Sequence, residues 1–394
     1  MRGLRMAMTT MLMPWITLPA QAANGAAPDY FTAPFAMERI LDWGERPDWS
    51  PDGRKIAFTR SDLEATPAYE IDVSSRTVRC LTCRWGANGL ITRIYYLPDG
   101  NFLVLGPPGL GTAKARPGAV AHRDAQTTEL YWMSASLDMP PVKLDAPAWG
   151  EIAISAKPGT AGGIQIAWGS AEATMSTIVT AELVAGRTGV ALTNRRVVYE
   201  HLHAKSTAGQ ATFAETYNFR GDGSALTFWT VEGGTLNGEM YELNLATGAV
   251  RPLSRDPAHN ETHFFPDERY GLEEANRASD PEGKFRGISS LEAPGVAAIM
   301  KALGGVDTRP EDLADYAPYG PLKGMARPFD LYVTSMIGEN KSRRLTEISH
   351  LGGNAHQSVV APDGQRIAFA MIAPRTGPYA GKSGLYIGTF GSAR

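Results

Sequence analysis

A short phrase recurs five times along this chain: an apolar strand, a turn built on Pro-Asp-Gly or a variant of it, and a second apolar strand. The turn chemistry joins two antiparallel strands, because Pro presets φ, Asp hydrogen-bonds its own backbone and Gly accepts a positive φ. A unit that repeats every 40–50 residues or so, or at about twice that spacing, is typical of a solenoid or a propeller. The five copies lie at Asp48–Phe58, Tyr95–Leu105, Asn218–Phe228, His263–Leu272 and Val359–Phe369.

The segments after each phrase predict a third and a fourth strand, so each phrase begins a four-stranded blade. A degenerate blade is expected between residues 152 and 200. The pattern predicts an all-β fold, a six-bladed β-propeller, with seven blades as the alternative because the last two turns are widely spaced. We expect Met37–Leu41 to supply the outer strand of the last blade. Such a closed ring leaves no long free sheet edge.

The wide spacing between the last two turns is better explained by an insertion at residues 276–328, in the fifth blade. Within it, Ser289–Leu303 has the periodicity of a helix.

Residues 1–22 are predicted to be a secretory signal peptide, because two arginines precede a short apolar stretch and the small-x-small pattern Ala20-Gln21-Ala22. Cleavage is expected after Ala22, followed by a linker at 23–36 and the propeller at 37–392.

Composition narrows the partners of the exported chain. The whole sequence has 38 basic and 41 acidic residues, and removal of Arg2 and Arg5 with the signal peptide changes the net charge from −3 to −5. A mildly acidic chain without basic runs argues against nucleic acid and anionic membranes as partners. No later stretch is apolar and long enough to span a membrane. We therefore expect a soluble monomer in the periplasm or outside the cell.

Cys80 and Cys83 are the two cysteines of the chain. In an oxidising compartment a local disulfide is plausible for such a pair, although idle thiols remain an alternative. A redox role would favour a helix N-terminus, whereas this C-x-x-C sequence follows a strand. A zinc site would need two further soft ligands.

The phrases WSPDGRKIAF and APDGQRIAF resemble the repeats of the TolB-like propellers. The resemblance covers roughly Met37 to Phe390 and implies the fold more strongly than the function. Prolyl oligopeptidases carry a related propeller, but this chain has no G-x-S-x-G sequence and ends at Arg394, so we do not expect a serine peptidase. The chain is also similar in size and export to oligogalacturonate lyase and related propeller lyases. Those enzymes use histidine with arginine, glutamine or a divalent metal around the central channel.

The turns also predict where a site would lie. In a propeller the innermost strand begins at the channel mouth and ends at the turn, so counting back six and five residues from the turn leads to the rim. Convergent charged side chains and imidazoles there would form a concave ligand site, although a polar rim can equally serve only to solvate the channel. The positions are Glu45/Arg46, Thr92/Arg93, Ile152/Ala153, Glu215/Thr216, Asn260/Glu261 and His356/Gln357, with Glu151 and His259 one residue further back.

These residue types suit a lyase that acts on a uronic-acid sugar. Such an enzyme needs a neutral base to remove the proton beside the carboxylate, for which His356 or His259 is suitable. It also needs positive charge near that carboxylate, from Arg46, Arg93 or a bound cation. The expected substrate-binding residues are Glu45, Glu151, Glu215, Asn260 and Gln357. The expected metal ligands, for Mn²⁺ or Ca²⁺, are Glu261, His259 and His356.

Two functions remain open at this point. The first is an exported protein that acts on or binds an oligosaccharide or polysaccharide at the channel mouth, with β-elimination favoured over hydrolysis by a pair such as Glu45 and Glu215. The second is a non-catalytic periplasmic propeller that binds or scaffolds other proteins.

Overall fold

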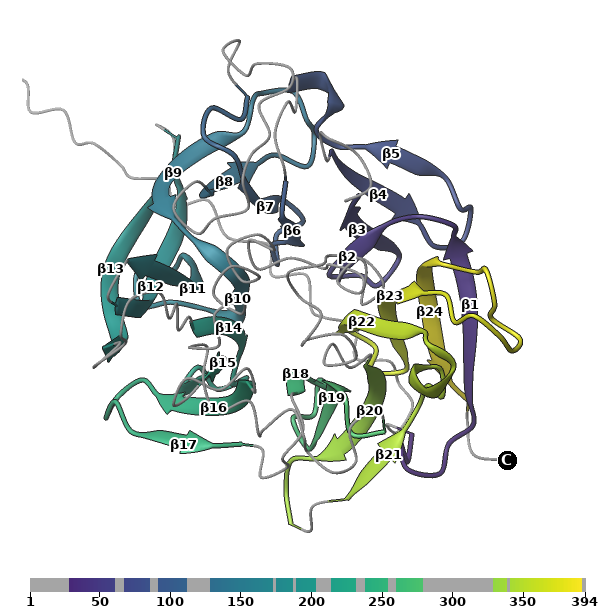
Figure 1. Ribbon diagram of the computed structural model, residues 1–394. Coiled ribbons are helices and arrows are strands. Elements are labelled where there is room, and N and C mark those ends of the chain that lie inside the picture. The colour runs from purple at the N-terminus through teal and green to yellow at the C-terminus, as the bar shows by residue number, and fades with distance from the viewer. Residues whose placement is uncertain are drawn as a thin grey trace, which may run out of the picture.

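A computed structural model of the 394-residue chain describes residues 28–60, 67–85, 91–111, 128–172, 175–186, 189–202, 214–231, 238–253, 260–278, 329–338 and 341–391. Their strands form six separate sheets of four antiparallel strands each. Figure 1 shows these sheets set like blades around a common axis. The prediction of an all-β, six-bladed propeller is therefore confirmed, and the count is six rather than the alternative of seven.

Each blade runs from an innermost strand at the axis to an outermost strand on the outside of the ring. The first three blades are β2 (Glu45–Trp49), β3 (Lys55–Thr59), β4 (Ala68–Asp72) and β5 (Val78–Cys80); β6 (Arg93–Tyr96), β7 (Phe102–Gly106), β8 (Glu129–Met133) and β9 (Val142–Pro147); and β10 (Trp149–Pro158), β11 (Ile164–Glu172), β12 (Met175–Gly186) and β13 (Gly189–Leu202). The last three are β14 (Ala214–Phe219), β15 (Ala225–Val231), β16 (Gly238–Asn244) and β17 (Val250–Pro252); β18 (Asn260–Phe264), β19 (Tyr270–Ala275), β20 (Asp330–Ser335) and β21 (Ser342–Arg344); and β22 (Asn354–Val360), β23 (Arg366–Ile372), β24 (Gly384–Phe390) and β1 (Phe35–Leu41). Two short 3₁₀ turns lie at η1 (Cys83–Trp85) and η4 (Ser349–Leu351).

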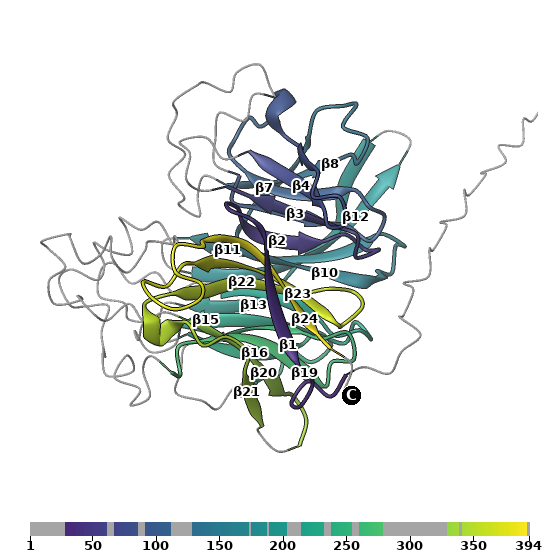
Figure 2. The same cartoon turned by 90° about the vertical axis from the view of Figure 1, so that its right-hand side faces the viewer.

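The ring closes where the first strand of the chain joins the last. β1 pairs antiparallel with β24, with Phe35 opposite Phe390, and Figure 2 shows the two strands side by side. The expected outer strand is confirmed, and it begins slightly earlier than Met37. Just before it, Tyr30 is 1% exposed and donates a hydrogen bond to the carbonyl of Gly364 at 2.8 Å.

Hydrogen bonds between adjacent blades provide partners for backbone N–H groups of the innermost strands. The inner edge of each sheet has no strand partner, and an unpaired buried N–H group would be costly. At each of the six junctions a side-chain oxygen of one blade accepts a hydrogen bond from a backbone N–H of the adjacent blade. The N–H groups of Arg46, Tyr96, Ile152, Ala153, Phe264 and Ser358 donate to Gln357, Asp48, Tyr95, Thr216, Asn218 and Glu274, respectively.

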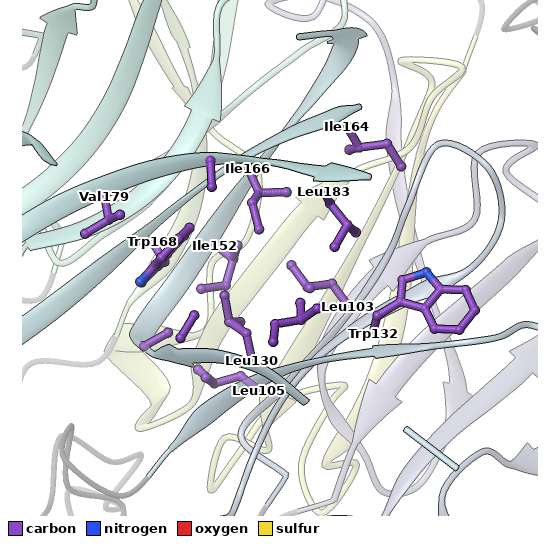
Figure 3. Close-up of a cluster of buried hydrophobic side chains, with 14 of the residues drawn as sticks. Leu103, Leu105, Leu130, Trp132, Ile152, Ile164, Ile166, Trp168, Val179 and Leu183 are labelled. Carbon is purple, nitrogen blue, oxygen red and sulfur yellow. The ribbon is translucent and has the colours of Figure 1, made fainter. Parts of the chain in front are cut away.

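The hydrophobic core is divided among the spaces between blades, because each sheet packs both faces against its neighbours. Figure 3 shows the cluster between the second and third blades, where Leu103 and Leu105 of β7 meet Ile166 and Trp168 of β11. The Trp168 side chain is fully buried. Burial of apolar area of this kind, at about 25 cal/mol per Å², is the main force that holds blade to blade.

The third blade differs from the other five. Its strands contain 10, 9, 12 and 14 residues, whereas those of the other blades contain 3 to 7. Its outer strands β12 and β13 form a long hairpin that pairs from Gly186 and Gly189 to Met175 and Leu202. This blade therefore presents more sheet surface than its neighbours can cover.

Cys80 and Cys83 form a disulfide at the end of β5, which agrees with the expected local pairing. The signal peptide and the expected helix Ser289–Leu303 lie outside the described residues. Within the described ranges, no helix has the length and apolar character that a bilayer crossing would require.

Candidate functional site

The rim positions expected from the turns lie at the beginnings of the innermost strands. Glu45 and Arg93 are the first residues of β2 and β6, while Glu215 and Glu261 are the second residues of β14 and β18. Glu151 is the third residue of β10. The charged side chains of blades two to five therefore meet at one end of the axis.

We call the group that forms there the channel cluster; it comprises Arg93, Tyr95, Glu151, Glu215, Tyr217, Glu261 and His263. Arg93 donates through its guanidinium to Glu151 of the next blade, and the Tyr95 hydroxyl donates to the other oxygen of that carboxylate. The Tyr95 oxygen also accepts the Ile152 N–H at 3.1 Å. Burial alone would raise the pKa of Glu151, but the Arg93 charge and these hydrogen bonds hold it below its ordinary value. Glu151 is thus an ionised partner for Arg93.

Glu215 behaves in the opposite way. Burial, reinforced by the nearby carboxylates of Glu261 and Glu151, raises the pKa of Glu215 to about 8. The Tyr217 hydroxyl donates to it at 3.1 Å. At neutral pH this carboxyl group is largely protonated and can give up a proton, which is the property of a general acid.

His263 lies beside Tyr217, with ring centroids 5.1 Å apart. Burial lowers the pKa of the His263 imidazole, and Arg93 acts in the same direction, against the opposing effect of Glu151 and Glu261. The ring is therefore neutral at neutral pH and can accept a proton. Like Arg93, Glu151 and Glu215, His263 is half-buried rather than fully buried.

Gly150 leaves room for the side chain of Glu215. Gly150 has a φ of +74° and lies in an irregular part of β10, where the register with β11 shifts. A Cβ atom at this position would lie 2.5 Å from Cγ of Glu215. The bare backbone of Gly150 thus allows Glu215 to approach Glu151 and Arg93.

A second arginine reaches the cluster from the first blade. The Nη1 atom of Arg46 donates to the carbonyl oxygen of Thr92 at 3.3 Å, and Nη1 of Arg93 donates to the same oxygen at 3.1 Å. Two guanidinium groups therefore share one acceptor. Oε1 of Glu45 lies 3.6 Å from Nε of Arg46. Each of the two guanidinium groups therefore has a carboxylate beside it: Glu45 beside Arg46, and Glu151 beside Arg93.

Arg46 is held in this place by its backbone. It has a φ of +55°, in a bulge of β2, and Gln357 has a φ of +56° in the corresponding bulge of β22. The Arg46 N–H donates to Oε1 of Gln357 at 2.9 Å. Non-glycine residues with positive φ are uncommon and cluster where a structure needs a special side-chain direction. Here the two bulges direct Arg46 toward Thr92.

Two further carboxyl groups, Asp48 and Glu274, have raised pKa values. Burial raises the pKa of Asp48 to about 7, and its side chain accepts the Tyr96 N–H at 2.6 Å. Burial, followed by the charge of Glu261, raises the pKa of Glu274 to about 8, and Glu274 accepts the Ser358 N–H. These groups join blades one to two and five to six at the edge of the site.

The residues predicted from the sequence fall into three groups. Arg93, Glu151, Glu215 and Glu261 come together in the channel cluster, and Arg46, with Glu45 and Gln357, lies next to it. His356 is 8% exposed, on β22. His259 lies outside the described residues, and of Asn260 only its place at the start of β18 is described.

The expected metal ligands remain untested, because His259 is one of them. Among the residues that are described, no group of three His, Cys, Asp or Glu side chains is arranged to hold a metal ion. The described donors thus do not complete the set of Glu261, His259 and His356, and we derive no step through a metal.

Counting one or two positions per blade missed Tyr95, Tyr217 and His263. Each of these follows an expected rim residue by two positions. Since alternate residues of a strand share a face, extending the count by two would have found all three.

No protein-family model and no curated protein matches the chain. Among solved structures, it is similar to one named for TolB from Agrobacterium tumefaciens, at 14% identity over 77% of this chain and 76% of that one, with a TM-score of 0.45. It is also similar to oligogalacturonate lyase from Vibrio parahaemolyticus, at 12% identity over 92% and 98%, with a TM-score of 0.43. Prolyl oligopeptidase B from Galerina marginata matches at 11% identity over 89% of this chain but 40% of that longer protein, with a TM-score of 0.44. The six four-stranded sheets make the chain a six-bladed propeller, and its function must be argued from its own residues.

Proposed function

We propose that this protein acts on an anionic, uronic-acid oligosaccharide at the channel mouth and cleaves it by β-elimination. The observation that carries the proposal is the convergence of Arg46 and Arg93 on the Thr92 carbonyl oxygen, beside a neutral imidazole and a protonated carboxyl. Glu45 and Glu151 already offset part of the repulsion between the two guanidinium groups. The planar donors of both groups also match the geometry of a substrate carboxylate.

The reaction assigns one role to each group. His263 removes the proton from the carbon next to the substrate carboxylate, and Arg46 and Arg93 stabilise the negative charge that develops on that carboxylate. The electron pair of the broken C–H bond forms a carbon–carbon double bond, and the bond to the glycosidic oxygen breaks. Glu215 gives its proton to that oxygen. No water is consumed, so the products are an unsaturated sugar and a new hydroxyl end.

The proposal changes the base that the sequence suggested. His356 is buried on the sixth blade, whereas His263 interacts electrostatically with Glu151, Glu261 and Arg93 of the cluster. The predicted export signal, with a periplasmic or secreted product cut after Ala22, is consistent with a saccharide substrate and remains part of the proposal.

The test is to incubate the full chain with a panel of uronic-acid oligosaccharides and follow the absorbance of the new double bond, with and without a chelator. We expect activity in the wild type and its loss in His263→Ala. The matched control is His350→Ala, which changes an exposed histidine in η4, on the sixth-blade side of the molecule. Equal activity of His263→Ala and the wild type would contradict the assigned base.

The alternative is a non-catalytic propeller that binds a protein partner. It predicts no double-bond absorbance with any sugar in the panel and no change of melting temperature when the sugars are added. A sugar that is not cleaved but raises the melting temperature of the wild type more than that of Arg46→Gln would indicate binding at the channel cluster, and would contradict the elimination.

A further inference from the structure

A polar pocket lies between the third and fourth blades, on the side of their turns and opposite the strand ends that carry the channel cluster. Its volume is about 660 Å³, within the range of about 300–1,000 Å³ that is usual for small-ligand sites. One wall is the face of β11–β13, and the other consists of the turns β14–β15 and β16–β17. We call this pocket the interblade groove.

The groove exists because the third blade is longer than its neighbour. Figure 1 shows β11–β13 next to β14–β16, and the strands of the fourth blade are shorter. Cross-strand rows on the uncovered face carry polar side chains: Gln165 is opposite Glu182, and Thr180 is opposite Arg196. A face that the next blade covered would carry apolar residues instead.

The floor of the groove is the carboxylate of Glu182, whose oxygens already accept hydrogen bonds from the protein. Glu182 is 5% exposed, and its oxygens accept hydrogen bonds from Thr160, Asn194 and the backbone of Ala161 and Gly163, at 2.8 to 3.4 Å. Gly159 leaves room for it, since a Cβ there would lie 2.2 Å from Cδ of Glu182. Four donors leave Glu182 little capacity to bind a cation from solvent.

The walls, in contrast, carry donors that remain available. Lys157 and Arg196 are exposed, and within the described residues neither has a carboxylate within 4 Å. Arg196 contacts the Thr180 hydroxyl at 3.4 Å. The Gln165 side chain is half-buried in the groove and makes no hydrogen bond to another described residue. Asp222 lies on the facing turn, near Lys157, and offers an acceptor for hydroxyl groups.

We infer that the interblade groove binds a carboxylated sugar as an accessory site. Lys157 and Arg196 bind the carboxylate, while Gln165 and Asp222 hydrogen-bond the ring hydroxyls. The described part of the lining contains no aromatic ring, so the recognition inferred here relies on charge and hydrogen bonds rather than on stacking. The choice of a sugar as the ligand rests on the proposed function. The contact with its carboxylate is assigned to Lys157 and Arg196, which lie in the groove together with the acidic Glu182 and Asp222.

Isothermal titration with a uronic-acid trisaccharide tests this inference, in full-length His263→Ala so that the sugar is not cleaved during the titration. We expect two binding sites in this chain, and the addition of K157A/R196A should weaken the groove site at least tenfold. The same two substitutions in the otherwise wild-type chain should leave cleavage of the trisaccharide unchanged. The matched control is Arg195→Gln, which removes a charge from the same strand; Arg195 instead contacts Trp168 and the Asp145 carbonyl, away from the groove. A carboxyl-reduced, neutral trisaccharide should bind the groove at least tenfold more weakly.

The outcomes separate this inference from the proposed function. If no sugar is cleaved but the groove site is lost in K157A/R196A, the proposed function fails and the accessory site stands. If cleavage occurs and K157A/R196A binds with wild-type stoichiometry and affinity, the accessory site is wrong. The absence of any binding that K157A/R196A weakens, or equal binding of the neutral sugar, also overturns it. A melting temperature within a few degrees of the wild type verifies folding of the variant, and Lys157→Ala alone provides a milder second change.

Discussion

At the scale of single residues, the site depends on a few positions where the backbone departs from regular strand geometry. Arg46 and Gln357 have positive φ without being glycines, and Gly150 has positive φ where a side chain would collide with Glu215. Strain of this kind persists only where the surrounding structure determines it. In this molecule the unusual backbone at Arg46 and Gln357 directs the Arg46 side chain, and the bare backbone of Gly150 leaves room for the carboxyl group of Glu215.

The first prediction concerns Gly150. Gly150→Ala should lower the free energy of unfolding by about 1–3 kcal/mol, because the new Cβ meets Glu215 and the φ is unfavourable for alanine. Chemical denaturation measures the change. Gly162→Ala is the matched control, since its φ is +80° and nothing lies within 4 Å of the added Cβ. Equal losses in the two variants would show that the contact with Glu215 is unimportant.

The second prediction concerns pH. The pKa values of Asp48, Glu215 and Glu274 are raised to about 7, 8 and 8 in the folded protein, so the folded state holds these protons more tightly than the unfolded chain. Their stabilising contribution is complete below about pH 4 and is lost progressively between about pH 4 and the folded pKa values of 7 to 8. We expect stability to fall over that window, and to fall less steeply in Asp48→Asn/Glu274→Gln, whose amide oxygens still accept the backbone N–H groups.

Denaturation at a series of pH values checks this slope. Asp222→Asn is the control, because hydrogen bonds from Ser224 lower the pKa of that exposed carboxyl and it titrates outside the window. An identical slope of stability against pH in the wild type and the double variant would contradict the raised pKa values assigned to Asp48 and Glu274.

At the scale of elements, the turn phrase predicted more than strand pairs. Because each turn ends an innermost strand, it also located the opposite ends of those strands, and Arg93, Glu151, Glu215 and Glu261 were found in this way. The bulges of β2 and β22 carry no sequence signal, since Arg46 and Gln357 are not turn residues. Their contact with each other, and the aim of Arg46 at Thr92, therefore required the structure.

The third prediction concerns the closure by β1. Tyr30 lies among Phe265, Tyr270 and Phe390, with centroid distances of 4.2 to 5.0 Å. Tyr30→Ala should cost about 3–5 kcal/mol, as for other large aromatic residues removed from a core. Tyr30→Phe should cost about 1 kcal/mol, because it loses only the hydrogen bond to Gly364. Denaturant titration distinguishes these values, and an equally small loss in both variants would contradict a closing role for this segment.

At the scale of the whole molecule, the propeller gathers residues from distant parts of the sequence around one axis. Arg46, Arg93 and His263 come from the first, second and fifth blades. The ring also places the interblade groove at the other end of the third blade, so two polar sites occupy opposite ends of one rigid fold. The length of that blade was not foreseen, because its degenerate phrase lacks the turn that marks the other blades.

The central claim is that paired arginines at the channel mouth support elimination from an anionic sugar. Its most direct test is the ratio kcat/KM for a uronic-acid trisaccharide in Arg46→Gln compared with Arg251→Gln, which removes an exposed arginine paired with Glu242 on the fourth blade. The proposal predicts a fall of about a hundredfold or more in Arg46→Gln, as for other groups that stabilise developing charge. It predicts less than a twofold change in Arg251→Gln. Equal values of kcat/KM for both variants and the wild type would contradict the claim.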